Sequence, residues 1–181
     1  MELFAKGKRA LIYKEGNTII KVEKENIQAV NRIHNEAEWL QILNVHKIGP
    51  TFLSFGDNKL HMEYIEGPTL EKYLQKASGS DRKAILQQLL KQARILDILH
   101  VNKQEMHRVT KNAIVRNKKL VLLDFERCKR TPKPKNVTQA CQFIAKHFHV
   151  PQIVEKAKHY KETYADKEFR EIEKCLTNTS W

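Results

Sequence analysis

Short apolar and β-branched runs separated by turn residues dominate the first third of the chain. Residues 10–13 and 18–22 flank the turn Glu15-Gly16-Asn17, and this pattern predicts a β-hairpin. Gly56-Asp57-Asn58 separates two later runs in the same way. The strands predicted in this part of the chain cover residues 3–6, 10–13, 18–22, 51–55 and 59–65.

The apolar period changes between the two hairpins. From residue 26 to residue 44, apolar side chains recur every three or four positions, which predicts an amphipathic helix with Asn26 as its N-cap. Gly49-Pro50 breaks the chain before the next strand. The predicted order is therefore β-β-β-α-β-β, and the apolar face of the helix comprises Ile27, Val30, Ile33, Ala37, Leu40 and Leu43.

The rest of the chain is mostly helical. Residues 81–100 carry an apolar stripe wide enough to predict a helix in the middle of its lobe. Two short apolar runs, at residues 112–115 and 120–125, predict a pair of strands. Because further helices are predicted at residues 69–76, 137–149, 151–164 and 166–176, the sequence as a whole predicts an α+β fold.

Charge and composition narrow the range of partners. The 181-residue chain is long enough for one domain or two small lobes, and its formal net charge of +12 favours polyanionic partners. A role in solubility alone is the alternative for the abundant lysine and glutamate. Three separated cysteines, the absence of an apolar leader and the absence of a long apolar stretch lead us to expect a cytoplasmic protein without a membrane segment.

Two charged side chains fall where the pattern predicts a buried surface. Lys21 follows the run Thr18-Ile19-Ile20, and a lysine on an inner strand can reach nucleotide phosphates. Glu36 lies on the apolar face of the predicted helix, where a carboxylate is costly unless it is paired. We therefore expect a Lys21–Glu36 ion pair. An exposed strand lysine and a boundary glutamate that reaches water are the alternatives.

Two further side chains suit a metal ion. Asn112 opens one predicted strand, and Asp124 lies at the end of the next. Their oxygens can share one ion, because Mg²⁺ prefers hard oxygen ligands and shares them with phosphates. A turn-forming role at the end of a strand is the alternative for Asp124.

In order along the chain, Lys21, Glu36, Asn112 and Asp124 resemble the functional set of protein kinases. That set comprises the third-strand lysine, the helix glutamate, the catalytic-loop asparagine and the metal-binding aspartate of an Asp-Phe-Gly motif. The resemblance covers residues 5–145, most of the chain.

The closest likeness is to the minimal kinases. These are the RIO family, the kinase of the KEOPS tRNA-modification complex and small archaeal predicted Ser/Thr kinases. The phrases Asn35-Glu36-Ala37 and Gly49-Pro50 look especially like this group.

The resemblance implies a two-lobed, protein-kinase-like fold that binds ATP together with Mg²⁺ or Mn²⁺. Residues 1–66 would form an N-lobe with a small antiparallel sheet and one long helix. Residues 67–181 would form a reduced helical C-lobe. Glu63 and Ile65 would lie in the hinge, where backbone groups of kinases hold adenine.

The chain departs from the kinase pattern at three places. Its phosphate-binding loop, residues 6–10, has the single glycine Gly7, so backbone near Gly7 and basic side chains would hold the phosphates. The motif Asp-Phe-Gly becomes Asp124-Phe125-Glu126. His107 stands five residues before Asn112, where kinases carry the catalytic aspartate, and Glu105 is the only carboxylate between Asp97 and Asp124.

Loss of that aspartate does not by itself abolish phosphoryl transfer, because positioning and charge neutralisation supply most of the rate. His107 or Glu105 can replace it as the base, and Lys111 can neutralise charge on the γ-phosphate. The resemblance thus implies an atypical Ser/Thr protein kinase, an autokinase or an ATPase, with an unknown protein substrate.

Two other functions stay open from the sequence. A pseudokinase would bind nucleotide and regulate a partner without catalysis, and His107 would then be an ordinary loop histidine. An accessory protein would contact RNA through a basic surface, and its affinity would fall steeply with salt. The side chains expected to carry that contact are Arg127, Lys129, Arg130, Lys133 and Lys135.

Overall fold

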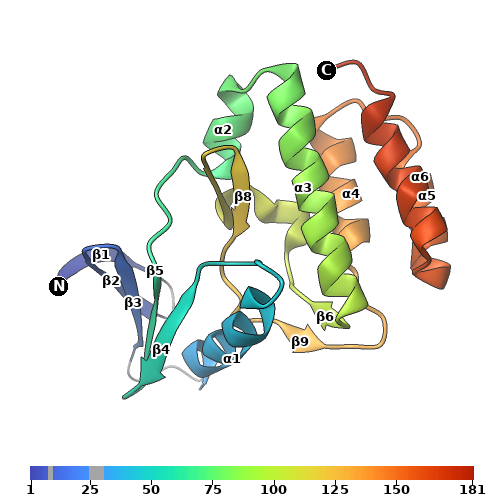
Figure 1. Cartoon of the computed structure of the whole chain (residues 1–181). Helices are drawn as coiled ribbons and strands as arrows, with labels where there is room; N and C mark the ends of the chain where they lie inside the picture. Colours follow the sequence, from blue (N-terminus) through green and yellow to red (C-terminus); the bar gives the residue numbers. More distant parts are fainter. Residues whose placement is uncertain (8–9, 25–30) are drawn as a thin grey trace. The chain divides into compact units, whose positions relative to one another are not determined.

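The computed structural model describes residues 1–7, 10–24 and 31–181. These residues form two compact units (Figure 1). One comprises Met1–Glu66 with Val121–Cys128, and the other comprises Gly67–Leu120 with Lys129–Trp181. The predicted α+β class is confirmed, because a sheet with one helix forms the first unit and helices dominate the second. Residues 121–128 pack with the first unit, although the sequence assigned them to the helical lobe.

A five-stranded antiparallel sheet forms most of the first unit, in the order β1-β2-β3-β5-β4. Both predicted hairpins are present. Asp57 and Asn58 have φ of 49° and 54°, which suits the two-residue type I′ turn that joins the last pair of strands. The strands are β1 (Glu2–Lys6), β2 (Ala10–Glu15), β3 (Thr18–Glu23), β4 (Phe52–Gly56) and β5 (Lys59–Glu63).

Helix α1 (Arg32–Asn44) packs against this sheet through the predicted apolar face. Ile33, Ala37, Leu40 and Leu43 are all buried, as the three-or-four-residue period requires. The predicted start of the helix, with the N-cap Asn26 and the apolar positions at 27 and 30, lies outside the described residues.

Gly49 lets the connection after α1 approach the core closely. Its φ is 83°, in the left-handed region that favours glycine. A Cβ at this position would lie 2.9 Å from Leu40 Cδ2 and 2.9 Å from Phe125 Cε2. Phe125 is fully buried, so the glycine and the segment after β8 (Lys119–Leu122) pack together in one core.

The second unit is built around helix α3 (Gly79–Ile98). Helices α4 (Asn136–His147) and α6 (Asp166–Thr177) pack against α3, so the predicted central position is confirmed (Figure 1). The buried stripe of α3 comprises Ile85, Leu86, Leu89, Leu90, Ala93 and Leu96. The helix begins two residues earlier than the sequence predicts, because Ser78 Oγ accepts a hydrogen bond from Asp81 N at 3.2 Å and caps it.

The remaining elements complete this unit and lead back to the first. Four predicted helices are present with shifted ends, and two very short strands and one 3₁₀ helix were not predicted. Strand β8 ends at Leu122, three residues before the predicted end. The elements are α2 (Leu70–Lys76), β6 (Val101–Asn102), the 3₁₀ helix η1 (Met106–Lys111), β7 (Ala113–Arg116), β8 (Lys119–Leu122), β9 (Lys129–Arg130), α4 (Asn136–His147), α5 (Ile153–Thr163) and α6 (Asp166–Thr177).

A buried polar network joins the helices of the second unit. The Asp97 carboxylate of α3 accepts hydrogen bonds from Asn136 N and Nδ2, at 3.0 and 2.7 Å, and from Tyr160 Oη at 3.0 Å. Arg94 donates to Tyr160 Oη at 2.9 Å and to Asp166 Oδ1 at 2.8 Å. Burial raises the pKa of Asp97, and these donors only partly oppose that effect. One network therefore fixes α3, α4, α5 and α6 together.

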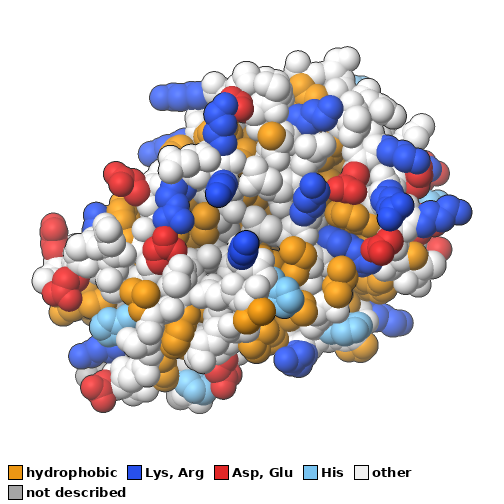
Figure 2. All heavy atoms as spheres, viewed as in Figure 1, with side chains coloured by type: hydrophobic (Ala, Val, Ile, Leu, Met, Phe, Trp, Pro, Cys, Tyr) orange, Lys and Arg blue, Asp and Glu red, His pale blue; other side chains and the backbone are white. Residues whose placement is uncertain are grey.

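The surface carries most of the basic charge. Lysine and arginine side chains are spread over the face of the molecule drawn in Figure 2, with acidic side chains among them. None of the described helices is long and apolar enough to span a lipid bilayer.

We expect Gly49→Ala to lower the free energy of unfolding by about 1–3 kcal/mol, because alanine is strained at this φ and its methyl group meets Leu40 and Phe125. Gly56→Ala is the matched control, since a Cβ there meets no heavy atom within 4 Å. Urea unfolding measures both variants. Equal stability of the two would contradict the close packing of Gly49 against Phe125.

Candidate functional site

The Lys21–Glu36 pair predicted from the sequence is present in the first unit. Lys21 lies on β3, the central strand of the sheet, and its Nζ is 2.8 and 2.7 Å from the two carboxylate oxygens of Glu36 on α1. The side chain of Glu36 is 2% exposed and that of Lys21 is 14% exposed. Burial by itself lowers the pKa of Lys21, but the charges of Glu36 and Asp124 outweigh it, so the pKa is raised. Lys21 is therefore held as an ammonium ion.

Glu36 also binds the backbone of the segment that follows β8. Phe125 N donates a hydrogen bond to Glu36 Oε1 at 3.2 Å. The carboxylate thus has a charged partner on β3 and a backbone partner between residues 121 and 128. A buried carboxylate needs such a set of donors, because an unpaired charge in the interior costs several kcal/mol.

Two neighbouring side chains of α1 hold the same segment. Asn35 Nδ2 donates to Glu126 O at 2.8 Å and to Cys128 O at 3.2 Å. Trp39 Nε1, one turn further along α1, donates to Cys128 O at 3.0 Å. These contacts fix α1 against residues 125–128 and so fix the position of Glu36. Sequence reasoning missed both roles, and the only local signal is that residues 35 and 39 share a helix face with spacing i, i+4.

Asp124 lies beside this pair and is exposed. Its φ is 64°, a left-handed conformation that aspartate tolerates better than most residues. This conformation, together with the Phe125 N–H bond to Glu36, explains why β8 ends earlier than predicted. The negative charge of Asp124 raises the pKa of Lys21, so the two groups interact electrostatically.

Gly7 directly follows β1 and contacts the first residue of β2. Its N–H donates to Ala10 O at 2.9 Å, and Lys24 Nζ donates to Gly7 O at 2.7 Å. The other residues of the predicted phosphate-binding loop, at positions 8 and 9, lie outside the described residues. Phosphate binding at Gly7 stays a prediction.

The predicted hinge residues follow β5. Glu63 is bound to Thr51, whose carbonyl accepts from Glu63 N at 2.9 Å and whose hydroxyl donates to Glu63 Oε2 at 2.8 Å. Tyr64 N donates to Asn17 O at 2.7 Å, and Ile65 is buried. These hydrogen bonds fix the backbone at residues 63 and 64. Adenine binding by Glu63 and Ile65 stays a prediction.

The candidate catalytic residues lie at η1 in the second unit. Glu105, His107 and Lys111 are exposed, and Asn112 is half-buried. The loop that carries them is fixed to α4, because Met106 N donates to Gln139 Oε1 at 3.1 Å. Its first part is fixed to the same helix, since Asn136 Oδ1 accepts from Lys103 N at 2.8 Å.

Two cavities adjoin this loop, and Glu105 and His107 line both of them. We call the first, of about 390 Å³, the lysine cavity, because Lys129, Lys133 and Lys135 also line it. We call the second, of about 400 Å³, the Asn112 cavity. Its walls also include Arg108, Lys111, Asn112, Phe143 and Lys146. The structure thus brings the predicted residues Glu105, His107, Lys111 and Asn112 together around one cavity.

The residues predicted to contact RNA differ in how exposed they are. Lys129, Lys133 and Lys135 are exposed in the lysine cavity. Arg130 is exposed on β9. Arg127 is half-buried in the first unit, with its Nε 3.8 Å from Glu126 Oε1.

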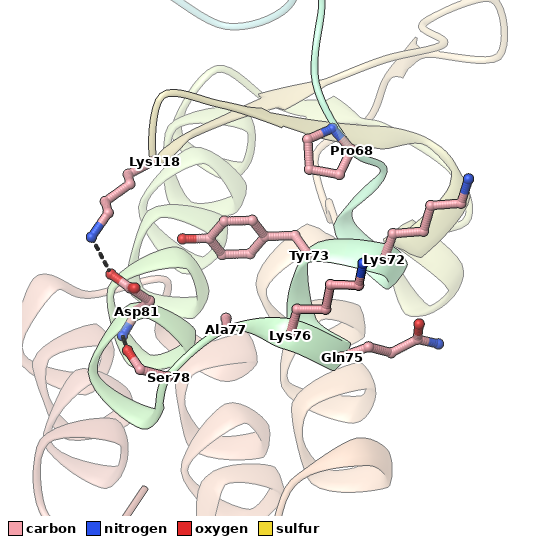
Figure 3. A pocket seen from close by; sticks show the side chains of 9 residues that line it. All are labelled: Pro68, Lys72, Tyr73, Gln75, Lys76, Ala77, Ser78, Asp81 and Lys118. Carbon is pink, nitrogen blue, oxygen red and sulfur yellow. Dashed lines mark hydrogen bonds and ion pairs between the residues drawn. The ribbon is translucent and has the colours of Figure 1, made fainter.

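A larger cavity, of about 720 Å³, lies elsewhere in the second unit, along α2, the start of α3 and the turn after β7 (Figure 3). The Tyr73 hydroxyl points toward the ion pair of Lys118 Nζ and Asp81 Oδ1, which are 2.9 Å apart. The hydrogen bond from Lys118 lowers the pKa of Asp81. No candidate catalytic, nucleotide-binding or metal-binding residue is among the lining residues of this cavity.

Comparison with known proteins identifies the fold. No protein-family model matches the chain, and no curated protein matches it. Among solved structures, it is similar to WbdD in complex with a kinase inhibitor, with a TM-score of 0.69 and 19% identity over 97% of the chain. It is also similar to a structure of the bifunctional kinase-methyltransferase WbdD, with a TM-score of 0.70 and 18% identity over 96% of the chain. The chain spans only 45% and 43% of those proteins.

The fold is therefore protein-kinase-like, as the resemblance in the sequence implied. The five-stranded sheet with helix α1 corresponds to the expected small strand-rich lobe, and the helical unit to the expected reduced lobe. The finer likeness to RIO and KEOPS kinases stays a prediction.

Asp124 and Asn112 suit a divalent cation by their chemistry. One offers an exposed carboxylate and the other a half-buried amide oxygen, and both are hard oxygen ligands of the kind that Mg²⁺ and Mn²⁺ prefer. Within the described residues, no three His, Cys, Asp or Glu side chains lie close enough together to hold a metal ion.

We expect Lys21→Met and Glu36→Gln each to lower the free energy of unfolding. The loss should be roughly 3–5 kcal/mol for Lys21→Met, because this substitution leaves the Glu36 carboxylate buried without its charged partner. The double variant should lose clearly less than the sum of the single losses, because it buries no unpaired charge. Urea unfolding at pH 7 measures the cycle. Additive losses would mean that the two side chains do not stabilise each other.

Proposed function

We propose that this protein is an ATP-dependent phosphotransferase, an atypical kinase that phosphorylates a hydroxyl group. The observation that carries the proposal is the arrangement of Lys21, Glu36 and Asp124 within one unit. A buried carboxylate holds an ammonium ion in place, and an exposed carboxylate lies beside it. In kinases these are the parts that bind nucleotide phosphates and their metal ion.

In the proposed reaction, the oxygen of the acceptor hydroxyl forms a bond to the γ-phosphorus of ATP. The bond between that phosphorus and the oxygen bridging to the β-phosphate breaks, and ADP leaves with its electron pair. The hydroxyl proton passes to His107 or Glu105. Lys21 binds nucleotide phosphates, and Lys111 and Arg108 neutralise charge on the γ-phosphoryl group as it moves.

Asp124 in the first unit is the residue that would hold Mg²⁺ or Mn²⁺, and the ion would supply further neutralisation of phosphate charge. Asn112 in the second unit is the other candidate ligand that the sequence indicates. Glu63 and Ile65 would contact adenine, and backbone near Gly7 would contact phosphates. The kinase-like fold and the matching positions in the sequence support these proposed roles.

For the acceptor, we favour a serine or threonine hydroxyl, on another protein or on this chain. The likeness of the sequence to minimal Ser/Thr kinases supports this choice. The similar solved protein WbdD is itself described as a kinase, and this chain spans less than half of it. Turnover should be slow, because an imidazole stands where kinases carry an aspartate.

ATP with Mg²⁺ should raise the melting temperature, and a ligand at 100 times its Kd stabilises by about 2.7 kcal/mol. We expect Asp124→Asn to remove the part of this shift that depends on Mg²⁺. Asp57→Asn is the matched control, because Asp57 is also exposed, also has positive φ and belongs to the same unit. Differential scanning fluorimetry with and without Mg²⁺ measures both. An equal shift in the two variants would exclude Asp124 as a metal ligand, and no shift in the parent protein would exclude the nucleotide site.

The two candidate bases can be separated by substitution. We expect His107→Gln to lower phosphotransfer by about 10²–10⁴-fold, the usual contribution of a general base, and Glu105→Gln to lower it less. His107 is favoured because it occupies the position of the kinase aspartate, five residues before Asn112. Undiminished transfer by the double variant would mean that no general base acts here. ATP binding without any turnover in the parent protein would favour the pseudokinase.

A further inference from the structure

The lysine cavity is positively charged and polar throughout. Lys129, Lys133 and Lys135 are exposed in it, and Glu105 is the one carboxylate among its lining residues. Within the described part of the chain, none of these three ammonium groups has a carboxylate partner, in contrast to Lys118, which is paired with Asp81. A concave surface with several unneutralised charges of one sign concentrates ions of the opposite sign.

The backbone that carries these lysines is fixed from several sides. Strand β9 pairs with β6 just before Thr131. Lys135 N donates to Asn102 Oδ1 at 2.9 Å, and Tyr164 Oη donates to Pro134 O at 2.8 Å. The opposite wall is fixed by the bond from Met106 N to Gln139 Oε1. A site whose walls are already ordered loses less entropy when it binds a ligand.

We infer that the lysine cavity binds a phosphomonoester group of the acceptor, so that the acceptor of phosphoryl transfer is itself a phosphorylated molecule. The role as an acceptor site rests on the proposed function. Lysine is a common phosphate ligand, and three lysines suit the double charge of a phosphomonoester better than the single charge of one carboxylate. His107 and Glu105 line both cavities, so a phosphate bound here lies next to the candidate base.

Two other occupants suit the cavity less well. A neutral acceptor would find no apolar lining, because the remaining walls come from Asn102, Gln104, Thr131 and Gln139. Single-stranded nucleic acid is held by basic grooves that also carry aromatic side chains for base stacking, and no Phe, Tyr or Trp lines this cavity.

The first test uses inorganic phosphate as the probe and the full chain without nucleotide. ¹H–¹⁵N NMR should show saturable shifts of the amides of residues 129–135, with sodium chloride at equal ionic strength as the reference. Lys133→Gln with Lys135→Gln should weaken phosphate binding at least about tenfold, and Lys133→Arg with Lys135→Arg should retain it. Lys158→Gln with Lys161→Gln is the matched control, because it removes two exposed lysines of α5 outside the cavity.

No saturable shift, or an equal loss in the control, would overturn the inference. Tight, salt-dependent binding of a single-stranded RNA oligonucleotide without saturable phosphate binding would also overturn it and would favour an RNA surface. The test is separate from that of the proposed function. Phosphate binding in a protein that binds no ATP would end the kinase proposal and leave the anion site in place.

The second test compares acceptors in the presence of ATP and Mg²⁺. A serine peptide with one phosphoserine is compared with the same peptide without phosphate, and glycerol 3-phosphate is compared with glycerol. Preference for the phosphopeptide or for glycerol 3-phosphate over its unphosphorylated form supports the inference. The preferred compound also shows whether the phosphorylated acceptor is a peptide or a small molecule. The Gln double variant should then raise KM for that acceptor while kcat changes little, as expected when binding alone is lost. Equal use of phosphorylated and unphosphorylated acceptors would contradict the inference.

Discussion

The buried carboxylate of Glu36 is the constraint on which the first unit depends. It accepts hydrogen bonds from Lys21 on β3 and from the backbone of Phe125, so a strand, a helix and a distant segment must meet around one charge. Removing any of these donors leaves an incompletely satisfied buried ion, which is among the costliest defects a small domain can carry. The Asp124 carboxylate acts electrostatically on the Lys21 ammonium, and these are the groups for which we propose metal and nucleotide binding.

A buried carboxylate also fixes the second unit, but its hydrogen-bond partners are different. Asp97 is buried and accepts from Asn136, and Asn136 Oδ1 in turn accepts from Lys103 N in the loop that leads to η1. The interior network therefore fixes the backbone that carries Glu105 and His107. The exposed lysines of the lysine cavity lie beside this fixed loop. Positional catalysis requires functional groups on rigid supports, and each unit supplies such a support for the groups proposed to act in it.

The sequence was sufficient to predict a feature when the evidence lay in neighbouring positions. That evidence was either the spacing of apolar side chains or a charged side chain on an apolar face. Glu36 could be paired with Lys21 because it interrupts an apolar stripe, and the position of α3 followed from the width of its own stripe. The bonds from Asn35, Glu36 and Trp39 to residues 125–128 join positions 89 to 93 residues apart, and no local pattern predicts such contacts. Strands of two residues, such as β6 and β9, are too short to produce a period. The lysine cavity depends on how separate segments fold together, so the sequence could identify its lysines only as a basic stretch.

We propose that the protein, through this arrangement of buried and exposed charges, transfers the γ-phosphoryl group of ATP. Incubation of the full chain with γ-³²P-labelled ATP and Mg²⁺, followed by separate counts of protein-bound and free phosphate, tests it most directly. We predict slow loss of label from ATP, with label recovered on protein or as free phosphate, and no loss when Lys21 is replaced by Met. Label that stays on ATP at millimolar nucleotide, with Mg²⁺ and with Mn²⁺, would contradict the claim.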